Sequence, residues 1–260
     1  MADPSSLLLV AGDPAPAAVQ NPGGSSPLLL LGDHAGRAVP ARLGDLGLGA
    51  ADLARHIAWD IGVAGLGRAL ASGLDAAFVH QRYSRLVIDC NRAPGSEDSI
   101  PVESDGATIA GNRDLGPRDR RARIRDIFEP YHHRIAAMLD GRQARVLRTI
   151  LVSLHSFTPT FAGLSRPWRF GVLHRADSAF SDAVFAGLRT RWGAAVGDNQ
   201  PYAMDGVDHT VPLHADPRGL DYLELEVRQD LIATVEQQSA IARSLTDVLR
   251  VALVACGLPA

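Results

Sequence analysis

Three positions in the sequence carry side chains that commonly bind divalent metals. His34 and His155 each follow a run of apolar residues, and Asp60 lies between them in the chain. Zinc in hydrolytic enzymes takes three protein ligands of the histidine and carboxylate type and keeps a fourth position open for water. His34, Asp60 and His155 can supply such a set if the fold brings them together. Spacing this long is a weak signal by itself, and no HExxH motif strengthens it.

Each of these residues also has an ordinary structural explanation. A histidine at the end of a strand is more often a hydrogen-bonded loop residue than a metal ligand. Asp60 can pair with His56, which lies four residues earlier on the same face of an expected helix. His132 and His133 are expected to be one packed and one partly exposed histidine. Three further histidines lie in loop-like surroundings and contact either substrate or solvent: His174, His209 and His214.

Arginines are dense between residues 80 and 92. Arg82, Arg85 and Arg92 all lie in this short segment. Because a guanidinium group binds a carboxylate with two parallel hydrogen bonds, such a cluster suits an acidic substrate. It is equally consistent with a structural role in which Arg85 or Arg92 pairs with Asp89 and holds the loop in place.

Two glutamates near the C-terminus could take part in proton transfer. Glu224 and Glu226 fall on one face of an expected strand, because strand side chains alternate between the two faces. A carboxylate at a strand end beside a metal can act as the general base for an attacking water. Taken alone, the same segment also fits a half-exposed edge strand.

The elements that must position these residues alternate between strands and helices. Strands are expected over residues 27–31, 77–80, 86–90, 146–154, 170–173, 194–197 and 222–227, and helices over 52–72, 119–139, 178–192 and 231–255. This alternation indicates an α/β fold with a mostly parallel sheet. Such sheets bind ligands outside the carboxyl ends of their strands, where His34 and His155 are expected.

Residues 1–26 differ in composition from the rest of the chain. They are rich in proline, alanine, glycine and serine, so we predict a flexible N-terminal arm followed by one domain over residues 27–260. The apolar stretch at residues 7–12 is too short for a signal peptide core or a membrane span. We therefore expect a cytoplasmic protein with no membrane partner.

Charge and cysteine content narrow the class of partner. The chain has 26 basic and 29 acidic residues, a net charge of −3 and no long basic run, which argues against a nucleic-acid partner and favours a small molecule. Its only cysteines, Cys90 and Cys256, lie far apart, which argues against a disulfide framework and against a thiolate zinc site. With 46% hydrophobic residues the chain can bury a sizeable core.

Six motifs, in the same order along the chain, resemble the N-formylglutamate amidohydrolase family. They are Asp33–Gly36, His56–Gly62, Tyr83–Arg92, Ser153–Pro159, Asp198–Tyr202 and Glu226–Asp230. The resemblance runs from about Pro27 to the C-terminal helix. It is closer to the branch of predicted amidohydrolases than to the histidine-degradation enzymes, whose opening motif is more like Pro-His-Ser-Gly.

The resemblance implies a fold and a metal site. The fold is a three-layer, phosphorylase/hydrolase-like α/β domain with a mostly parallel sheet, related to zinc carboxypeptidases and zinc amidases. One zinc ion is expected on His34, Asp60 and His155, with His56 as an alternative to Asp60. Glu226 is the expected general base, with Glu224 as the fallback.

The resemblance also implies a reaction. The expected activity is metal-dependent hydrolysis of an N-formyl or N-acyl amino acid, by default N-formyl-L-glutamate to formate and L-glutamate. The expected substrate-binding residues are Arg85 and Arg92 first, then Arg82, Arg228, Asn199 and His214. Two alternatives stay open: a zinc amidase or carboxypeptidase acting on peptide-like amides, and a non-catalytic protein that binds acidic small molecules. The exact acyl group, the amino acid, the metal in the cell and the oligomeric state, homo-oligomers included, are also open.

Overall fold

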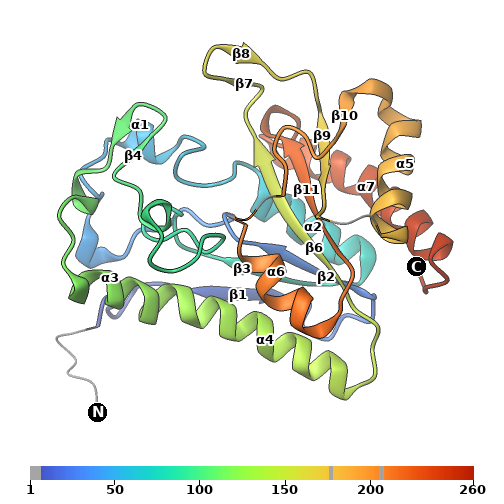
Figure 1. The fold of residues 1–260 in the computed structure, drawn as a ribbon, viewed down its shortest axis with the longest axis horizontal. Helices are drawn as coiled ribbons and strands as arrows, with labels where there is room; N and C mark the ends of the chain where they lie inside the picture. Colours follow the sequence, from blue (N-terminus) through green and yellow to red (C-terminus); the bar gives the residue numbers. More distant parts are fainter. Residues whose placement is uncertain (1–6, 176–177, 205, 207) are drawn as a thin grey trace.

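The computed structural model describes residues 7–175, 178–204, 206 and 208–260, and its centre is a seven-stranded sheet (Figure 1). The strand order is β1-β3-β2-β6-β11-β9-β10. Within the sheet, β1 is antiparallel to β3 and β11 is antiparallel to β9, whereas all other neighbours are parallel. The strands are β1 (Ala17–Gln20), β2 (Leu28–Gly32), β3 (Ala77–Gln81), β6 (Ile150–Phe157), β9 (Phe170–Leu173), β10 (Val196–Asp198) and β11 (Tyr222–Arg228).

Helices cover both faces of this sheet, so the fold has three layers. The helices are α1 (Ala50–Leu53), α2 (Val63–Leu74), α3 (Pro117–Arg123), α4 (Glu129–Ala144), α5 (Ala179–Trp192), α6 (Thr210–Ala215) and α7 (Val235–Ala255). Helices α2, α5 and α7 pack on one face, and α4 and α6 pack on the other (Figure 1). The predicted α/β fold with a mostly parallel sheet is confirmed. Among the described residues, no helix has the length and apolar character needed to cross a bilayer.

The apolar run in β2 explains why this strand lies inside the sheet. Leu28 and Leu30 belong to the hydrophobic core beneath α2 and α7, whereas Leu29 and Leu31 belong to the core beneath α4. Alternation of side chains along a strand sends neighbouring leucines to opposite faces, and a strand covered on both faces must be apolar throughout. Each fully buried leucine stabilises the fold by about 1.5–3 kcal/mol. The end of β2 is therefore held firmly in place.

The described residues also form two short antiparallel ribbons outside the central sheet. They are β4 (Glu103–Ser104) with β5 (Ala107–Thr108), and β7 (Thr160–Phe161) with β8 (Leu164–Ser165). The β7–β8 hairpin continues directly from the end of β6 and extends beyond the sheet (Figure 1). It therefore lies beside the edge at which the parallel strands end.

The predicted helix over residues 119–139 is confirmed, and it is longer than expected. Helix α3 passes through a π-helical segment, Ile124–Phe128, into α4. At this junction the buried Arg123 donates hydrogen bonds to the carbonyl of Val87 at 2.8 Å and to Oδ1 of Asn112 at 2.7 Å. The helix thus anchors the long loop that carries Asp89.

Three sequence predictions about local structure are wrong. The arm predicted to be flexible over residues 1–26 includes strand β1, and Tyr83 donates a hydrogen bond to the carbonyl of Pro14 at 2.7 Å. Residues 1–6 lie outside the described residues. The helix expected over 52–72 is interrupted between α1 and α2. The segment expected to form a strand over 86–90 is irregular and contains turns. Its apolar residues are buried in the same hydrophobic core as residues of α4, and such burial does not require pairing with another strand.

Candidate active site

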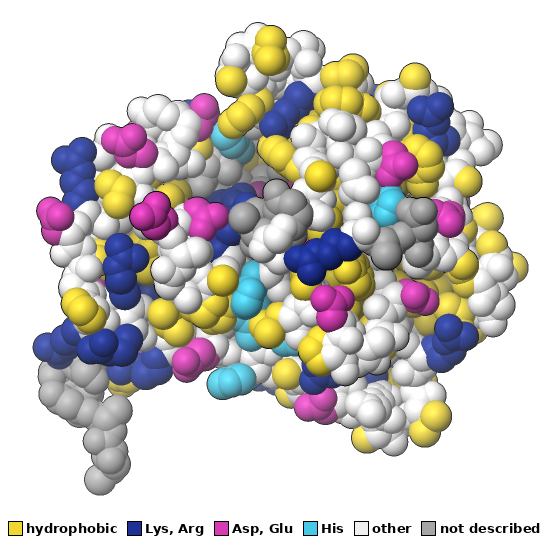
Figure 2. Space-filling model, in the orientation of Figure 1, with side chains coloured by type: hydrophobic (Ala, Val, Ile, Leu, Met, Phe, Trp, Pro, Cys, Tyr) yellow, Lys and Arg dark blue, Asp and Glu magenta, His cyan; other side chains and the backbone are white. Residues whose placement is uncertain are grey.

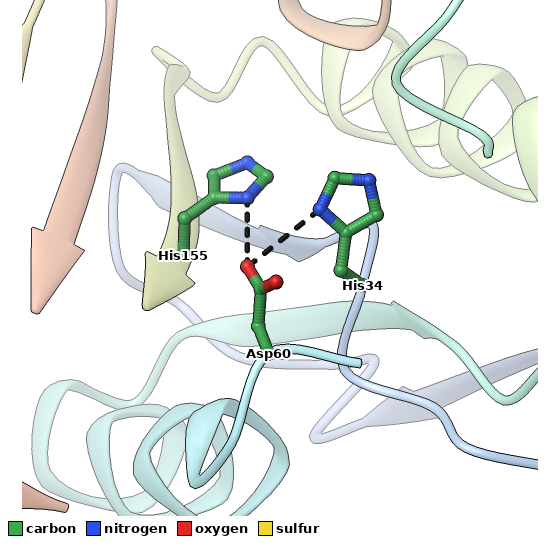
Figure 3. Close-up of side chains that lie close together, drawn as sticks. All are labelled: His34, Asp60 and His155. Carbon is green, nitrogen blue, oxygen red and sulfur yellow. Dashed lines mark hydrogen bonds and ion pairs between the residues drawn. The ribbon is translucent and has the colours of Figure 1, made fainter. Parts of the chain in front are cut away.

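His34, Asp60 and His155 meet at the carboxyl edge of the sheet. Nδ1 of His34 lies 3.6 Å from Oδ2 of Asp60, and Nδ1 of His155 lies 3.1 Å from the same oxygen. One ligand atom from each residue falls within 4.8 Å of the others, and all three residues are buried. Figure 3 shows both imidazoles turned toward the Asp60 carboxylate. The structure therefore brings together the three residues whose types predicted a metal site.

The backbone at Asp60 explains how this residue reaches the two histidines. His34 lies two residues after the end of β2, and its carbonyl accepts a hydrogen bond from the Asp60 amide at 2.9 Å. Gly62, at the start of α2, has a φ of 87°, which a side chain would strain. This turn places Asp60 before the helix, where its Oδ2 also accepts the Ser156 amide at 3.1 Å.

The alternative ligand His56 is directed elsewhere. His56 precedes α2 in the irregular segment, so it shares no helix face with Asp60. Its Nε2 lies 3.1 Å from Oδ2 of Asp105 in a partly exposed pair. His56 lines the same pocket as the three grouped residues but makes its contact at the rim. The geometry favours Asp60 over His56 as the third ligand.

The second ring nitrogen of each histidine contacts a buried polar group. Nε2 of His34 lies 2.7 Å from Oδ1 of Asp89. Nε2 of His155 lies 3.0 Å from Oγ of Ser153 and 3.5 Å from Oδ2 of Asp33. Such partners fix the orientation of metal-binding imidazoles and leave the other nitrogen free to bind the ion.

These supporting residues were not predicted from the sequence. Asp33 is buried and accepts hydrogen bonds from Tyr131 at 2.8 Å and from Ser153 at 3.0 Å. Asp89 was considered only as a partner for arginine. Two signals could have found them: Asp33 is adjacent to His34, and Ser153 lies two residues before His155 on the same face of a strand.

The donor atoms fit a zinc-type metal. Nδ1 of His34 is buried and makes no hydrogen bond within the described part of the chain. Two imidazole nitrogens and one carboxylate are the kind of ligand set that catalytic zinc sites use, and zinc held by them would supply Lewis acidity. Buried polar atoms normally have a hydrogen-bond partner. Binding of a cation would explain why Nδ1 of His34, which lies close to Asp60 and His155, has none among the described residues.

Electrostatics keep the aspartates of the site ionised. Burial alone raises the pKa of Asp60, but the charges of His34 and His155 and their hydrogen bonds to Asp60 together hold this pKa below its ordinary value. The same holds for Asp33: burial raises its pKa, and His155, His34 and Thr210 together hold it below its ordinary value. Asp60 is thus ionised, which is the form in which a carboxylate can bind a metal.

Glu224 and Glu226 face the same site from β11. In the parallel register Glu224 pairs with Ser153 and Glu226 pairs with His155, so their side chains lie on one face. Both glutamates are buried, which corrects the edge-strand alternative, and burial raises the pKa of Glu224 to about 8 and that of Glu226 to about 7. A carboxyl group with a pKa near neutrality can both accept and return a proton.

These residues line a pocket that encloses about 280 Å³. This volume is at the small end of ligand sites and suits a compact molecule. Figure 2 shows the face hollowed below the β7–β8 hairpin, with basic, acidic and histidine side chains in and around the hollow. The lining residues are His34, His56, Asp60, Arg85, Asn91, Arg92, His155, Ser156, Phe157, Thr158, Leu173, Tyr202, Ala203, Asp208, Glu224 and Glu226.

Of the expected substrate-binding residues, Arg85 and Arg92 reach the pocket, and both already contact carboxylates. Arg85 lies 2.6 Å from Asp89 and 3.6 Å from Asp60. Arg92 lies 3.1 Å from Asp98 and 3.4 Å from Asp208. The pair between Arg85 and Asp89, which was expected if Arg85 has a structural role, is therefore present beside the pocket.

The other four expected substrate-binding residues do not line this pocket. Arg82 is exposed, and Arg228 pairs with Asp230 at 2.8 Å. Oδ1 of Asn199 accepts the backbone amide of residue 174 at 3.0 Å. His214 is buried in α6 and does not line the pocket. Strand register and loop packing, which the sequence pattern does not show, decide which polar residues face the cavity.

His214 is part of a buried histidine pair. Its Nε2 lies 3.0 Å from Nδ1 of His132, and the two rings stack with centroids 5.3 Å apart. Neighbouring His133 is exposed, which confirms the expectation of one packed and one exposed histidine. The pair supports the wall formed by α4 and α6.

Comparisons with known proteins agree with this architecture. The family model described as N-formylglutamate amidohydrolase matches residues 26–233. The crystal structure of a gene product from Agrobacterium tumefaciens is 38% identical, with a TM-score of 0.92, over 96% of this chain and 99% of that chain. The N-formylglutamate amidohydrolase from Ralstonia eutropha shares the fold at 21% identity and a TM-score of 0.68, over 94% of this chain and 99% of that chain. No curated protein matches the sequence.

Proposed function

The chain belongs to the N-formylglutamate amidohydrolase family, as its ordered motifs predict, and we propose that it hydrolyses the amide bond of an N-formyl or N-acyl amino acid. The default substrate is N-formyl-L-glutamate, which gives formate and L-glutamate. One observation carries the proposal: His34, Asp60 and His155 converge in the pocket that also contains the buried Glu226. The pocket therefore combines a metal-type ligand set with a proton acceptor.

In this proposal His34, Asp60 and His155 hold one zinc ion. When bound, zinc supplies Lewis acidity, which polarises an amide oxygen and makes water more acidic. Asp89 and Ser153 fix the ring orientation of His34 and His155 through the second nitrogens. The site is thus organised by hydrogen bonds before any substrate enters.

Glu226 is the proposed general base. Its Oε2 is buried and has no hydrogen-bond partner among the residues that the structure describes. Glu226 would take one proton from the attacking water, whose oxygen bonds to the acyl carbon. As the carbon–nitrogen bond breaks, Glu226 would return that proton to the leaving nitrogen. A pKa of about 7 suits both transfers near neutral pH.

The experiment that tests the proposal uses one purified sample for metal content and for hydrolysis. A panel of N-formyl and N-acetyl amino acids is assayed before chelation, after chelation and after zinc is returned. We expect stoichiometric zinc and turnover of N-formyl-L-glutamate that disappears with the metal and recovers with zinc. Stoichiometric zinc without turnover on the panel would reject the substrate and direct the search to peptide-like amides. Absence of both would favour a binding protein.

A further inference from the structure

Arg166 lies between three aromatic rings beside the pocket. It immediately follows the β7–β8 hairpin and is only 8% exposed. Its Cζ lies 4.8 Å from the ring centroids of Phe161 and Tyr202, and 5.8 Å from that of Phe157. Aromatic faces attract a guanidinium at these distances. The rings therefore hold the position of the cation.

Apart from an interaction with the Tyr202 hydroxyl, the hydrogen-bond donors of Arg166 are poorly used within the described part of the chain. The N–H groups of a guanidinium point outward in its own plane, whereas stacked rings contact its faces. One terminal nitrogen lies 3.5 Å from the Thr158 carbonyl and 3.4 Å from the Thr158 hydroxyl, and both distances are long for hydrogen bonds. Within the described ranges, Arg166 forms no ion pair with a carboxylate.

Arg166 differs in this respect from the two arginines that line the pocket. Arg85 and Arg92 each form close ion pairs with carboxylates, whereas among the described residues Arg166 forms no such pair and interacts with the Glu226 carboxyl group only at longer range. A buried charge without a counter-ion is costly, and an anionic ligand removes that cost. Phe157, Thr158 and Tyr202 contact Arg166 and also line the pocket, so the cation and the cavity share a wall.

We propose that Arg166 is a specificity residue whose guanidinium edge binds a carboxylate of the substrate. This inference rests on the proposed function, because the substrate is taken to be an acidic N-acyl amino acid. The aromatic rings fix the guanidinium plane, and its free edge then meets the carboxylate with two parallel hydrogen bonds. Arg166 thus joins the β7–β8 hairpin to substrate selection.

The kinetic test compares substrates that differ by one charge. Arg166→Gln and wild type are assayed with N-formyl-L-glutamate, with its α-amide and with N-formyl-L-glutamine. Loss of a charged hydrogen bond should lower kcat/KM for N-formyl-L-glutamate by about 10- to 100-fold. For the amide that lacks the carboxylate bound by Arg166, kcat/KM should differ between Arg166→Gln and wild type by less than about threefold. An equal loss on all three substrates, or no loss on any, would overturn the proposal.

Two further variants separate recognition from folding. Arg166→Lys keeps the charge between the rings but loses the planar fork, so it should recover part of the activity on N-formyl-L-glutamate. Arg191→Gln is the matched control, because Arg191 is exposed on α5 and pairs with the exposed Asp247 of α7. Thermal unfolding of each variant shows whether the fold is intact. If Arg166→Lys is no better than Arg166→Gln although both fold, carboxylate binding by the positive charge is rejected.

A binding experiment distinguishes failure of this inference from failure of the proposed function. Calorimetry measures glutarate, a simple dicarboxylate, against its monoamide on the zinc-loaded wild type and on Arg166→Gln. The wild type should prefer glutarate, and Arg166→Gln should reduce that preference about 10-fold or more. This result in a protein that hydrolyses no N-formyl amino acid would support Arg166 and reject the reaction. An unchanged preference would reject Arg166 whether or not the reaction occurs.

Discussion

Nε2 of His34 lies 2.7 Å from Oδ1 of Asp89, and both residues are buried. The carboxylate orients the imidazole so that Nδ1 faces Asp60 and His155, and it also binds Arg85 at 2.6 Å. We expect Asp89→Asn to weaken zinc binding by about 10- to 100-fold, because outer partners of this kind tune ligand basicity and ring orientation. Competition with a chromogenic chelator measures the affinity. Asp98→Asn is the control, since Asp98 contacts Arg92 away from the histidines.

The ligand set itself is tested by truncation. His34→Ala and His155→Ala each remove one of three donors, so each should leave less than stoichiometric zinc after dialysis and no measurable hydrolysis. His133→Ala removes an exposed imidazole and is the matched control. Zinc content is measured by atomic absorption on folded protein. Full zinc occupancy in His34→Ala would remove His34 from the ligand set.

Glu226→Gln separates proton transfer from metal binding. The amide keeps the size of the side chain but cannot accept a proton, so kcat should fall by about 10²- to 10⁴-fold while zinc content stays stoichiometric. Steady-state kinetics and metal analysis on the same sample test both parts. Glu129→Gln, on the exposed surface of α4, is the control. Activity close to wild type would transfer the role to Glu224, whose pKa burial raises to about 8.

The buried histidine pair predicts an acid-sensitive fold. Burial lowers the pKa of His132 to about 3 and that of His214 to about 4, from an ordinary value of 6.5. As the pH falls below 6.5, the unfolded chain binds protons that the folded chain does not, so the free energy of unfolding decreases. Each imidazole lowers the free energy of unfolding by up to about 1.4 kcal/mol for each pH unit of acidification, until the pH reaches its pKa in the folded chain.

Urea unfolding in the presence of a chelator, from about pH 7 to about pH 4.5, measures this slope. His214→Gln should have a shallower slope than wild type, because one of the two titrating groups is gone. His133→Gln is the matched control for loss of an imidazole. Equal slopes for His214→Gln and wild type would contradict the assignment, whatever the absolute stability of the variant.

The sequence by itself predicted most helices and strands and the grouping of His34, Asp60 and His155. The expected strand at 170–173 coincides with β9, and the expected helix at 178–192 differs from α5 by one residue. Hydrophobic periodicity reports these elements because it reflects local burial. His34 and His155 were identifiable because polar residues at strand ends meet at one edge of a parallel sheet.

Only the tertiary structure decided which residues support and surround that triad. Asp89 is 55 residues from His34 in the chain, and Arg166 packs on Tyr202, a distant residue in the chain that lines the pocket. Contacts of this kind depend on strand register and loop packing, which single-chain periodicity does not encode. For the same reason, the apolar residues at 86–90 predicted a strand although they are buried in a loop. The pairing of β1 with β3 was not predictable from a proline-rich segment.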